Sequence, residues 1–206
     1  MILTYHDGFC VRASAGDTTI VFGPISKQSK DYKPTNFGAD VALVSLNHPD
    51  MNGSEEAGRG DKQPFIISGP GEYEVKDIVV FGFPSESEYG GEKRINTLYS
   101  VSFDGLSVFY AGAVGTTALP KDLEDMDSPD ILIVPISDKG ALTPAEAQKL
   151  AVSLEAKIVI PVAYDDKSLK LFLKEAGAEG VKPEEKLTLK KKDVAGKENE
   201  VVVLKA

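Results

Sequence analysis

The chain has 206 residues, of which 42% are hydrophobic and 27% are charged, which is typical of a globular protein with a sizeable core. Its formal net charge of −9 argues against a nucleic-acid ligand, because binding phosphates requires a basic surface. One cysteine excludes a disulfide framework and a cysteine-rich zinc site, and no apolar run approaches the roughly 20 residues that cross a bilayer, so we expect a cytoplasmic protein with no membrane partner.

The first half of the chain has the pattern of short strands joined by turns. Residues 2–5, 9–13, 18–22 and 41–44 are expected to form an antiparallel meander, with a tight turn at Gly16 and Asp17. Further strands are predicted at residues 65–67, 78–83, 96–103 and 106–110, and Asp104 with Gly105 predicts a hairpin turn between the last two. Glu72 and Glu74 fall in a glycine-rich turn and strand start, where surface roles are favoured.

Strands alternate with helices after Gly115. Helices are predicted at residues 119–126, 143–154 and 167–176, and strands at residues 131–134 and 157–160. Thr143, Pro144 and Glu146 combine a capping box with proline at the first helical position. A last pair of strands, 186–190 and 200–204, is expected to meet across a turn at residues 194–197. The pattern predicts one α/β domain over residues 1–206, in which helices lie outside two mixed sheets.

A loop with the sequence Ser-Leu-Asn-His-Pro-Asp-Met follows the predicted strand at residues 41–44. It resembles the metal loop of the metallo-β-lactamase superfamily, Ser-His-X-His-X-Asp-His, which follows a strand of the same kind. Residues 2–5 with Cys10, and the blocks 39–45, 69–75, 96–99, 110–115 and 158–164, extend the likeness to the ascorbate-lactonase-like branch in the same order. The resemblance implies a four-layer αββα sandwich of two mixed sheets and a metal-dependent hydrolase as ancestor.

Most of the family's metal ligands are absent from the matching positions. Of the loop ligands only His48 and Asp50 are present, and the family's Gly-His-Ser-Cys is here Asp-Gly-Phe-Cys at residues 7–10. Its His-Ala-Gly-Asp is Tyr-Ala-Gly-Ala at residues 110–113, and its Pro-Met-His-Tyr is Pro-Val-Ala-Tyr at residues 161–164. A catalytic zinc takes about three protein ligands, so the two that remain are too few. His6, the only other histidine, is expected to be a partly exposed strand residue.

Two functions remain open at this point. The first is a non-catalytic metallo-β-lactamase-fold protein that binds a small molecule or a protein, with no cofactor and with His48 serving turn geometry beside an Asp50 that accepts backbone hydrogen bonds. The second is a zinc-dependent hydrolase of a small ester, lactone or phosphoester, with catalytic candidates His48, Asp50, Tyr110 and Tyr164 near the loop of Ser87 and Glu88. The resemblance also allows a homo-oligomer.

Overall fold

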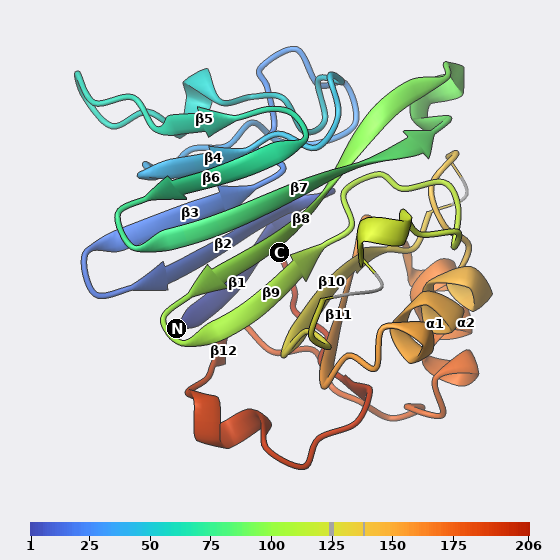
Figure 1. Cartoon of the computed structure of the whole chain (residues 1–206). Coiled ribbons are helices and arrows are strands. Elements are labelled where there is room, and N and C mark those ends of the chain that lie inside the picture. The colour runs from blue at the N-terminus through green and yellow to red at the C-terminus, as the bar shows by residue number, and fades with distance from the viewer. Residues whose placement is uncertain (124–125, 138) are drawn as a thin grey trace.

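Two mixed β-sheets pack face to face in the computed structural model, which describes residues 1–123, 126–137 and 139–206 (Figure 1). The main core lies between the sheets, where alternate residues of strands from both sheets meet, among them Leu3, Phe22 and Leu43 from one and Tyr99 and Ile133 from the other. This arrangement follows from the strand pattern, because each strand turns one row of apolar side chains toward the facing sheet.

The first sheet has the strand order β12-β1-β2-β3-β4-β5. Its strands are β12 (Leu187–Thr188), β1 (Ile2–Asp7), β2 (Cys10–Ala15), β3 (Thr18–Phe22), β4 (Val41–Leu43) and β5 (Phe65–Ile67). β1, β2 and β3 pair antiparallel as predicted, but β4 runs parallel to β3, so the predicted meander is wrong at its last strand. The physical reason is the long connection at residues 23–40, which returns the chain to the other end of the sheet before β4 begins.

The second sheet has the order β13-β11-β10-β9-β8-β7-β6. Its strands are β13 (Glu200–Val201), β11 (Ile158–Val162), β10 (Ile131–Pro135), β9 (Leu106–Tyr110), β8 (Arg94–Phe103), β7 (Ile78–Ser87) and β6 (Gly71–Val75). The sequence did not predict β6 as a full strand, and β7 continues beyond its predicted end. β7 and β8 therefore form a long hairpin that projects past the rest of the sheet (Figure 1).

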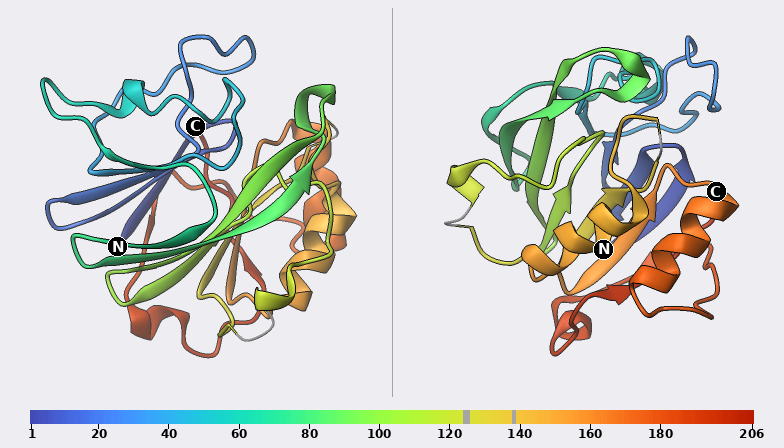
Figure 2. Two further views of the ribbon diagram at one scale, coloured as in Figure 1. Left: turned by 45° about the horizontal axis from the view of Figure 1, so that its top comes forward. Right: turned by 90° about the vertical axis from the view of Figure 1, so that its right-hand side faces the viewer.

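Two α-helices, α1 (Pro144–Ser153) and α2 (Asp166–Glu175), lie together against the outer face of the second sheet (Figure 2). α1 begins at the predicted capping box of Thr143 and Glu146, and α2 begins at a second one formed by Asp165 and Ser168. Four short 3₁₀-helices complete the described secondary structure: η1 (Glu55–Ala57), η2 (Tyr89–Gly91), η3 (Lys121–Leu123) and η4 (Lys191–Val194).

The outer face of the first sheet is covered by a loop that carries Ile25, Tyr32 and Phe37, which pack with Cys10, Val21 and Ala42. The α/β sandwich of two mixed sheets is thus confirmed, with both described α-helices on one side of it. No helix among residues 1–123, 126–137 and 139–206 is both long and apolar enough to cross a membrane.

Two further predictions differ from the structure. β12 and β13 lie in different sheets, so the expected hairpin across residues 194–197 is wrong, and η4 connects the two sheets at that point. At residues 119–126 the described part forms only the turn η3, and residues 124 and 125 of the predicted helix lie outside the described residues.

Candidate functional site

The loop from Ser45 to Met51 lies at one end of the sandwich and links the two sheets. Val44 N–H donates to Ile67 O of β5 at 2.8 Å, and Ser45 O accepts the N–H of Thr97 in β8 at 2.7 Å. The loop then turns tightly, because His48 N–H donates to Leu46 O at 2.8 Å. These contacts place the loop between the end of β5 and strand β8, just after β4.

Asp50 is 2% exposed, and both oxygens of its carboxylate accept hydrogen bonds from side chains. Ser29 Oγ donates to Oδ1 at 2.6 Å, and Tyr89 OH donates to Oδ2 at 2.7 Å. We expected backbone donors here, and that expectation is wrong, because hydroxyl groups from residues 21 positions before Asp50 and 39 positions after it reach the carboxylate instead. These bonds compensate the cost of burying the carboxylate.

His48 is held beside Asp50, with its Nδ1 3.5 Å from Asp50 Oδ2. The same Nδ1 accepts the backbone N–H of Asp50 at 3.3 Å, so in the neutral ring the proton resides on Nε2. The ring also contacts Tyr89 edge to face at 5.0 Å between centroids. The side chain is 21% exposed and borders a surface hollow of about 310 Å³. Nδ1 of His48 therefore accepts a hydrogen bond from a backbone amide of its own turn.

The remaining family ligand positions are brought together by the fold and are apolar. The structure packs Leu46, Met51, Ala113 and Ala163 into one buried cluster. Phe9, which stands in the family's early histidine motif, and Tyr89 belong to the same cluster, with their rings edge to face at 4.9 Å. Each of these six residues is at most 7% exposed. The volume at this end of the sandwich is therefore occupied by hydrocarbon and aromatic groups.

These residues do not fit a zinc ion. Alanine and leucine offer no donor atom, and the sulfur of Met51 already accepts a hydrogen bond from Ser45 Oγ at 3.4 Å. In the described parts of the chain, no three His, Cys, Asp or Glu side chains lie close enough to hold a metal ion. The described residues of this site therefore do not provide the ligands for metal-dependent chemistry.

The other catalytic candidates do not converge on His48. Tyr110 is fully buried in the main core, its OH donates to Phe9 O at 3.1 Å, and burial raises the pKa of its phenol. Tyr164 donates to Leu204 O, and burial raises its pKa as well. Ser87 does reach the site, since its Oγ donates to Ala113 O at 2.6 Å, whereas Glu88 is exposed. The hydroxyl of Ser87 thus holds the backbone of the site.

His6 of β1 and Cys10 of β2 have side chains that contact the loop on the outer face of the first sheet. The His6 ring stacks on Phe37 at 4.2 Å, and burial together with the nearby Arg12 lowers its pKa. Cys10 is buried, and burial raises the pKa of its thiol to about 12. The prediction that Cys10 is a small buried hydrophobic residue is confirmed.

Sequence reasoning missed three residues that shape the site: Ser29, Tyr89 and Asn96. Asn96 is fully buried, donates to Ala111 O at 3.0 Å and accepts the N–H of Ala113 at 2.9 Å, so it fixes the turn at the family's bridging-ligand position. Burial, and then the hydrogen bond to the Asp50 carboxylate, raises the pKa of Tyr89, which keeps its phenol a donor. No motif spacing indicates these partners, because each contact joins segments that only the tertiary fold brings together.

Comparison with known proteins agrees with the two-sheet fold. A family model described as a beta-lactamase superfamily domain matches residues 2–163. A Bacillus licheniformis protein named a metal-dependent hydrolase is 25% identical over 80% of this chain and 85% of its own length, and YtkL of Bacillus subtilis, with the same description, is 24% identical over 80% and 86%. The crystal structure of a Thermotoga maritima protein titled as a member of the metallo-beta-lactamase superfamily superposes with a TM-score of 0.74 at 24% identity, covering 98% of this chain and 97% of that one. By the match over residues 2–163 and by its two-sheet sandwich, the chain belongs to the metallo-β-lactamase superfamily.

Proposed function

We propose that this protein is a member of the metallo-β-lactamase superfamily that has lost most of its metal ligands and serves as a non-catalytic scaffold that binds a small molecule or a protein partner. The observation that carries the proposal is the apolar cluster, in which Leu46, Met51, Ala113 and Ala163 pack with Phe9 and Tyr89. A hydrolytic zinc centre needs about three donors and an open position for water, and this cluster supplies neither.

The two donors that remain support the same proposal. The two carboxylate oxygens of Asp50 accept hydrogen bonds from Ser29 and Tyr89, and Nδ1 of His48 accepts one from the backbone N–H of Asp50. A metal bound here would compete with these hydrogen-bond donors for Asp50 and would gain no third ligand from the described residues. The energetic balance therefore favours the loop as it stands, with no tightly held metal cofactor.

The test measures metal content and metal response together. The protein, purified without chelators, is expected to contain far less than one metal per chain by elemental analysis, and excess zinc is expected to leave its melting temperature unchanged. Asp50→Asn serves as a matched control, because it removes the charge of the last retained carboxylate while keeping its shape. A stoichiometric metal, or a zinc-induced rise in melting temperature that Asp50→Asn abolishes, would refute the proposal.

A second candidate is a metal-dependent hydrolase of a small ester, lactone or phosphoester with an altered site. The names of the relatives favour it, as does the retention of His48 and Asp50 side by side, with His48 bordering a solvent-facing hollow. Under this candidate, His48→Ala abolishes hydrolysis of a panel of such substrates, while Val152→Ala on the exposed face of α1 does not. Hydrolysis that survives His48→Ala removes the candidate.

A further inference from the structure

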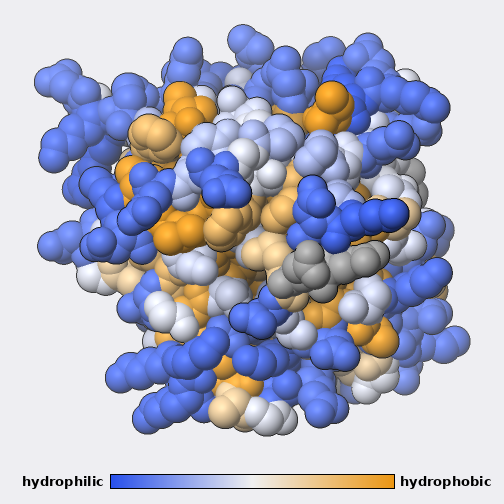
Figure 3. Space-filling view, in the orientation of Figure 1, coloured by the Kyte–Doolittle hydropathy of each residue, from blue (hydrophilic) through white to orange (hydrophobic). Residues whose placement is uncertain are grey.

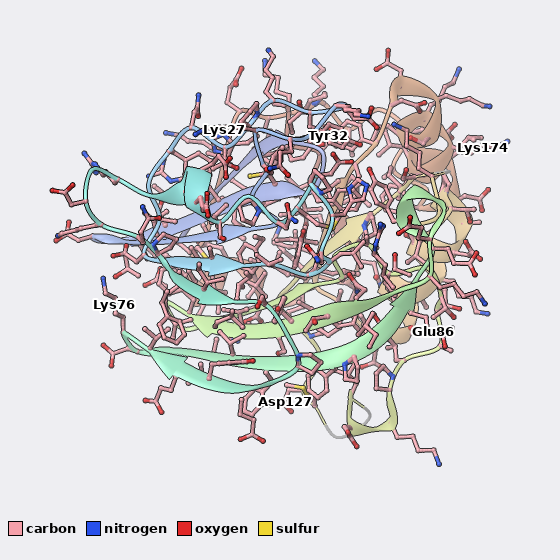
Figure 4. The ribbon with its side chains drawn as sticks, turned by 90° about the horizontal axis from the view of Figure 1, so that it is seen from above. Lys27, Tyr32, Lys76, Glu86, Asp127 and Lys174 are labelled. Atoms are coloured by element: carbon pink, nitrogen blue, oxygen red, sulfur yellow. The ribbon has the colours of Figure 1, made fainter. Side chains whose placement is uncertain are left out.

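A second hollow lies beside the loop of His48, between this loop, β5 and β8. It is a cleft of about 460 Å³, within the range of ligand pockets. The loop contributes Asn47, Asn52 and Ser54, the connection from β5 to β6 contributes Ser68 and Pro70, and Ile95 of β8 forms part of the other wall. Figure 4 views the molecule from the side of these loops, with Tyr32 and Glu86 marked.

None of the described residues that line this cleft is charged, although the chain carries a net charge of −9. Ile66 and Ile95, both in the lining, are 47% and 72% exposed, and the adjacent Phe65 is 50% exposed. Apolar side chains also break the hydrophilic surface over β5 in Figure 3. A charged ligand would lose hydration here without meeting an opposite charge, so the surface favours an uncharged one.

The edge of β5 offers backbone groups to such a ligand. β5 is the last strand of its sheet, and Phe65 N–H and Ile67 O bond to the β4 side, at 2.8 Å each. Because bonding alternates along a parallel strand, the N–H and C=O of Ile66 point away from β4, toward the free edge. Edge strands are usually protected by charge, and the other three edges carry or adjoin charged residues. Those residues are Glu72 and Glu74 on β6, Glu200 on β13, and Lys186 beside β12.

The stretch around β5 is protected against the pairing of an added strand only at its two ends. Residues 63–71 read Gln-Pro-Phe-Ile-Ile-Ser-Gly-Pro-Gly, with no charge. Pro64 and Pro70 lack an N–H, so an added strand can pair only over the short segment between them. In the cleft beside this segment, Asn52 Nδ2 donates to Asn47 Oδ1 at 2.9 Å, which leaves the Asn47 amide N–H and the Asn52 oxygen available to a peptide group.

We propose that the β5 edge and the adjoining cleft bind a short, extended, uncharged peptide segment of a partner protein. The peptide adds a strand at Ile66 and places one neutral side chain in the cleft, against Ile95 and beside the hydrogen-bonded Asn47 and Asn52 amides. Main-chain bonds then supply affinity and the cleft supplies selectivity, which is the division of roles in β-strand addition. The inference rests on the proposed binding role and specifies its partner, and the residues altered in its test, Ile66 and Ile95, are not at the family's metal-ligand positions.

The test is a selection with random 12-residue peptides displayed on phage against the immobilised full chain. We expect the selected peptides to share an uncharged run of about five residues, as the short edge allows. Binding of a synthesised peptide, measured by fluorescence polarisation, should weaken at least about tenfold in Ile66→Lys and in Ile95→Lys, since each places a charge in the interface. Val152→Lys, at another exposed apolar residue (55%), is the matched control and should bind as the unaltered chain does.

Several outcomes would overturn the proposal. They are a selection that yields no peptide or only charged peptides, and binding that survives both Ile66→Lys and Ile95→Lys. A further such outcome would come from sedimentation of the unaltered chain without peptide. If the chain is a dimer and Ile66→Lys converts it to a monomer, a second copy of the chain occupies the edge of β5. Because the zinc measurements do not involve the β5 edge, failure here is distinguishable from failure of the non-catalytic assignment.

Discussion

Replacing Tyr89 by phenylalanine removes one hydrogen bond and leaves the packing of the site in place. The phenol donates to Asp50 at 2.7 Å inside the protein, and a buried hydrogen bond to a charged group contributes about 1.5–3 kcal/mol. The phenylalanine ring keeps the edge-to-face contacts with Phe9 and His48, at 4.9 and 5.0 Å. We therefore expect Tyr89→Phe to lower the free energy of unfolding by about 2 kcal/mol.

Urea unfolding followed by circular dichroism measures this loss. With an m-value of about 2 kcal/mol/M, the midpoint should fall by about 1 M at unchanged m. Tyr73→Phe is the matched control, because its phenol donates at 3.1 Å to Gly69 O from a partly exposed position, and it should cost less than about 1 kcal/mol. A double-mutant cycle with Asp50→Asn should return a coupling energy above about 1 kcal/mol.

A loss below about 0.5 kcal/mol for Tyr89→Phe would refute the reasoning. It would mean that the carboxylate of Asp50 does not depend on the tyrosine and is free to serve another partner, which would weaken the case against a metal. The same conclusion would follow if the cycle with Asp50→Asn gave no coupling.

Three further predictions concern burial and charge. Ala113→Asp places a carboxylate at the family's bridging position inside the apolar cluster, so the free energy of unfolding in urea should fall by more than about 3 kcal/mol. Added zinc should not restore the lost stability. The control Ala118→Asp, at an exposed residue, should change the free energy of unfolding by no more than about 0.5 kcal/mol. Burial opposes the ionisation of Asp130, but Lys157 and Lys191, each at 2.6 Å, outweigh it and hold its pKa below the ordinary value. The unfolded chain then takes up this proton first as the pH falls, so stability should drop from about pH 5 downward through the folded-state pKa, and urea midpoints of Asp130→Asn should lack this part of the pH dependence. Cys10, buried and with a thiol pKa of about 12, should react with a thiol reagent only after unfolding, and rapid reaction of the folded chain would contradict its burial.

The fold was largely predictable because its pieces are local. The hairpin turns at Gly16 and at Asp104, and the capping box at Thr143, are set by neighbouring residues, and the structure confirms each of them. The errors concern pairing at long range. Whether β4 runs parallel to β3, and which sheet receives β12 or β13, depends on how the connections cross the molecule, and strand patterns are the same in either case.

The candidate site was predictable to the extent that the resemblance placed residues on the same loops. Residues 46, 51, 113 and 163 stand at positions that match ligand positions of the family, and the structure brings them into one cluster. The resemblance could not indicate what fills the space between them. Tyr89 and Ser29 reach Asp50 from segments with no family motif, and only the packed structure shows that the carboxylate has two hydroxyl partners.

Those partners suggest why His48 and Asp50 can remain when the other ligands are absent. Asp50 connects three segments: its own loop, the loop of Ser29 over the first sheet, and the Tyr89 turn at the tip of the β7–β8 hairpin. Two hydroxyl donors and an apolar cluster hold these segments together, and the carboxylate thereby has a structural role that needs no metal. Under the proposed function, this role accounts for the presence of His48 and Asp50, and it is why the Tyr89→Phe measurement bears on function as well as on stability.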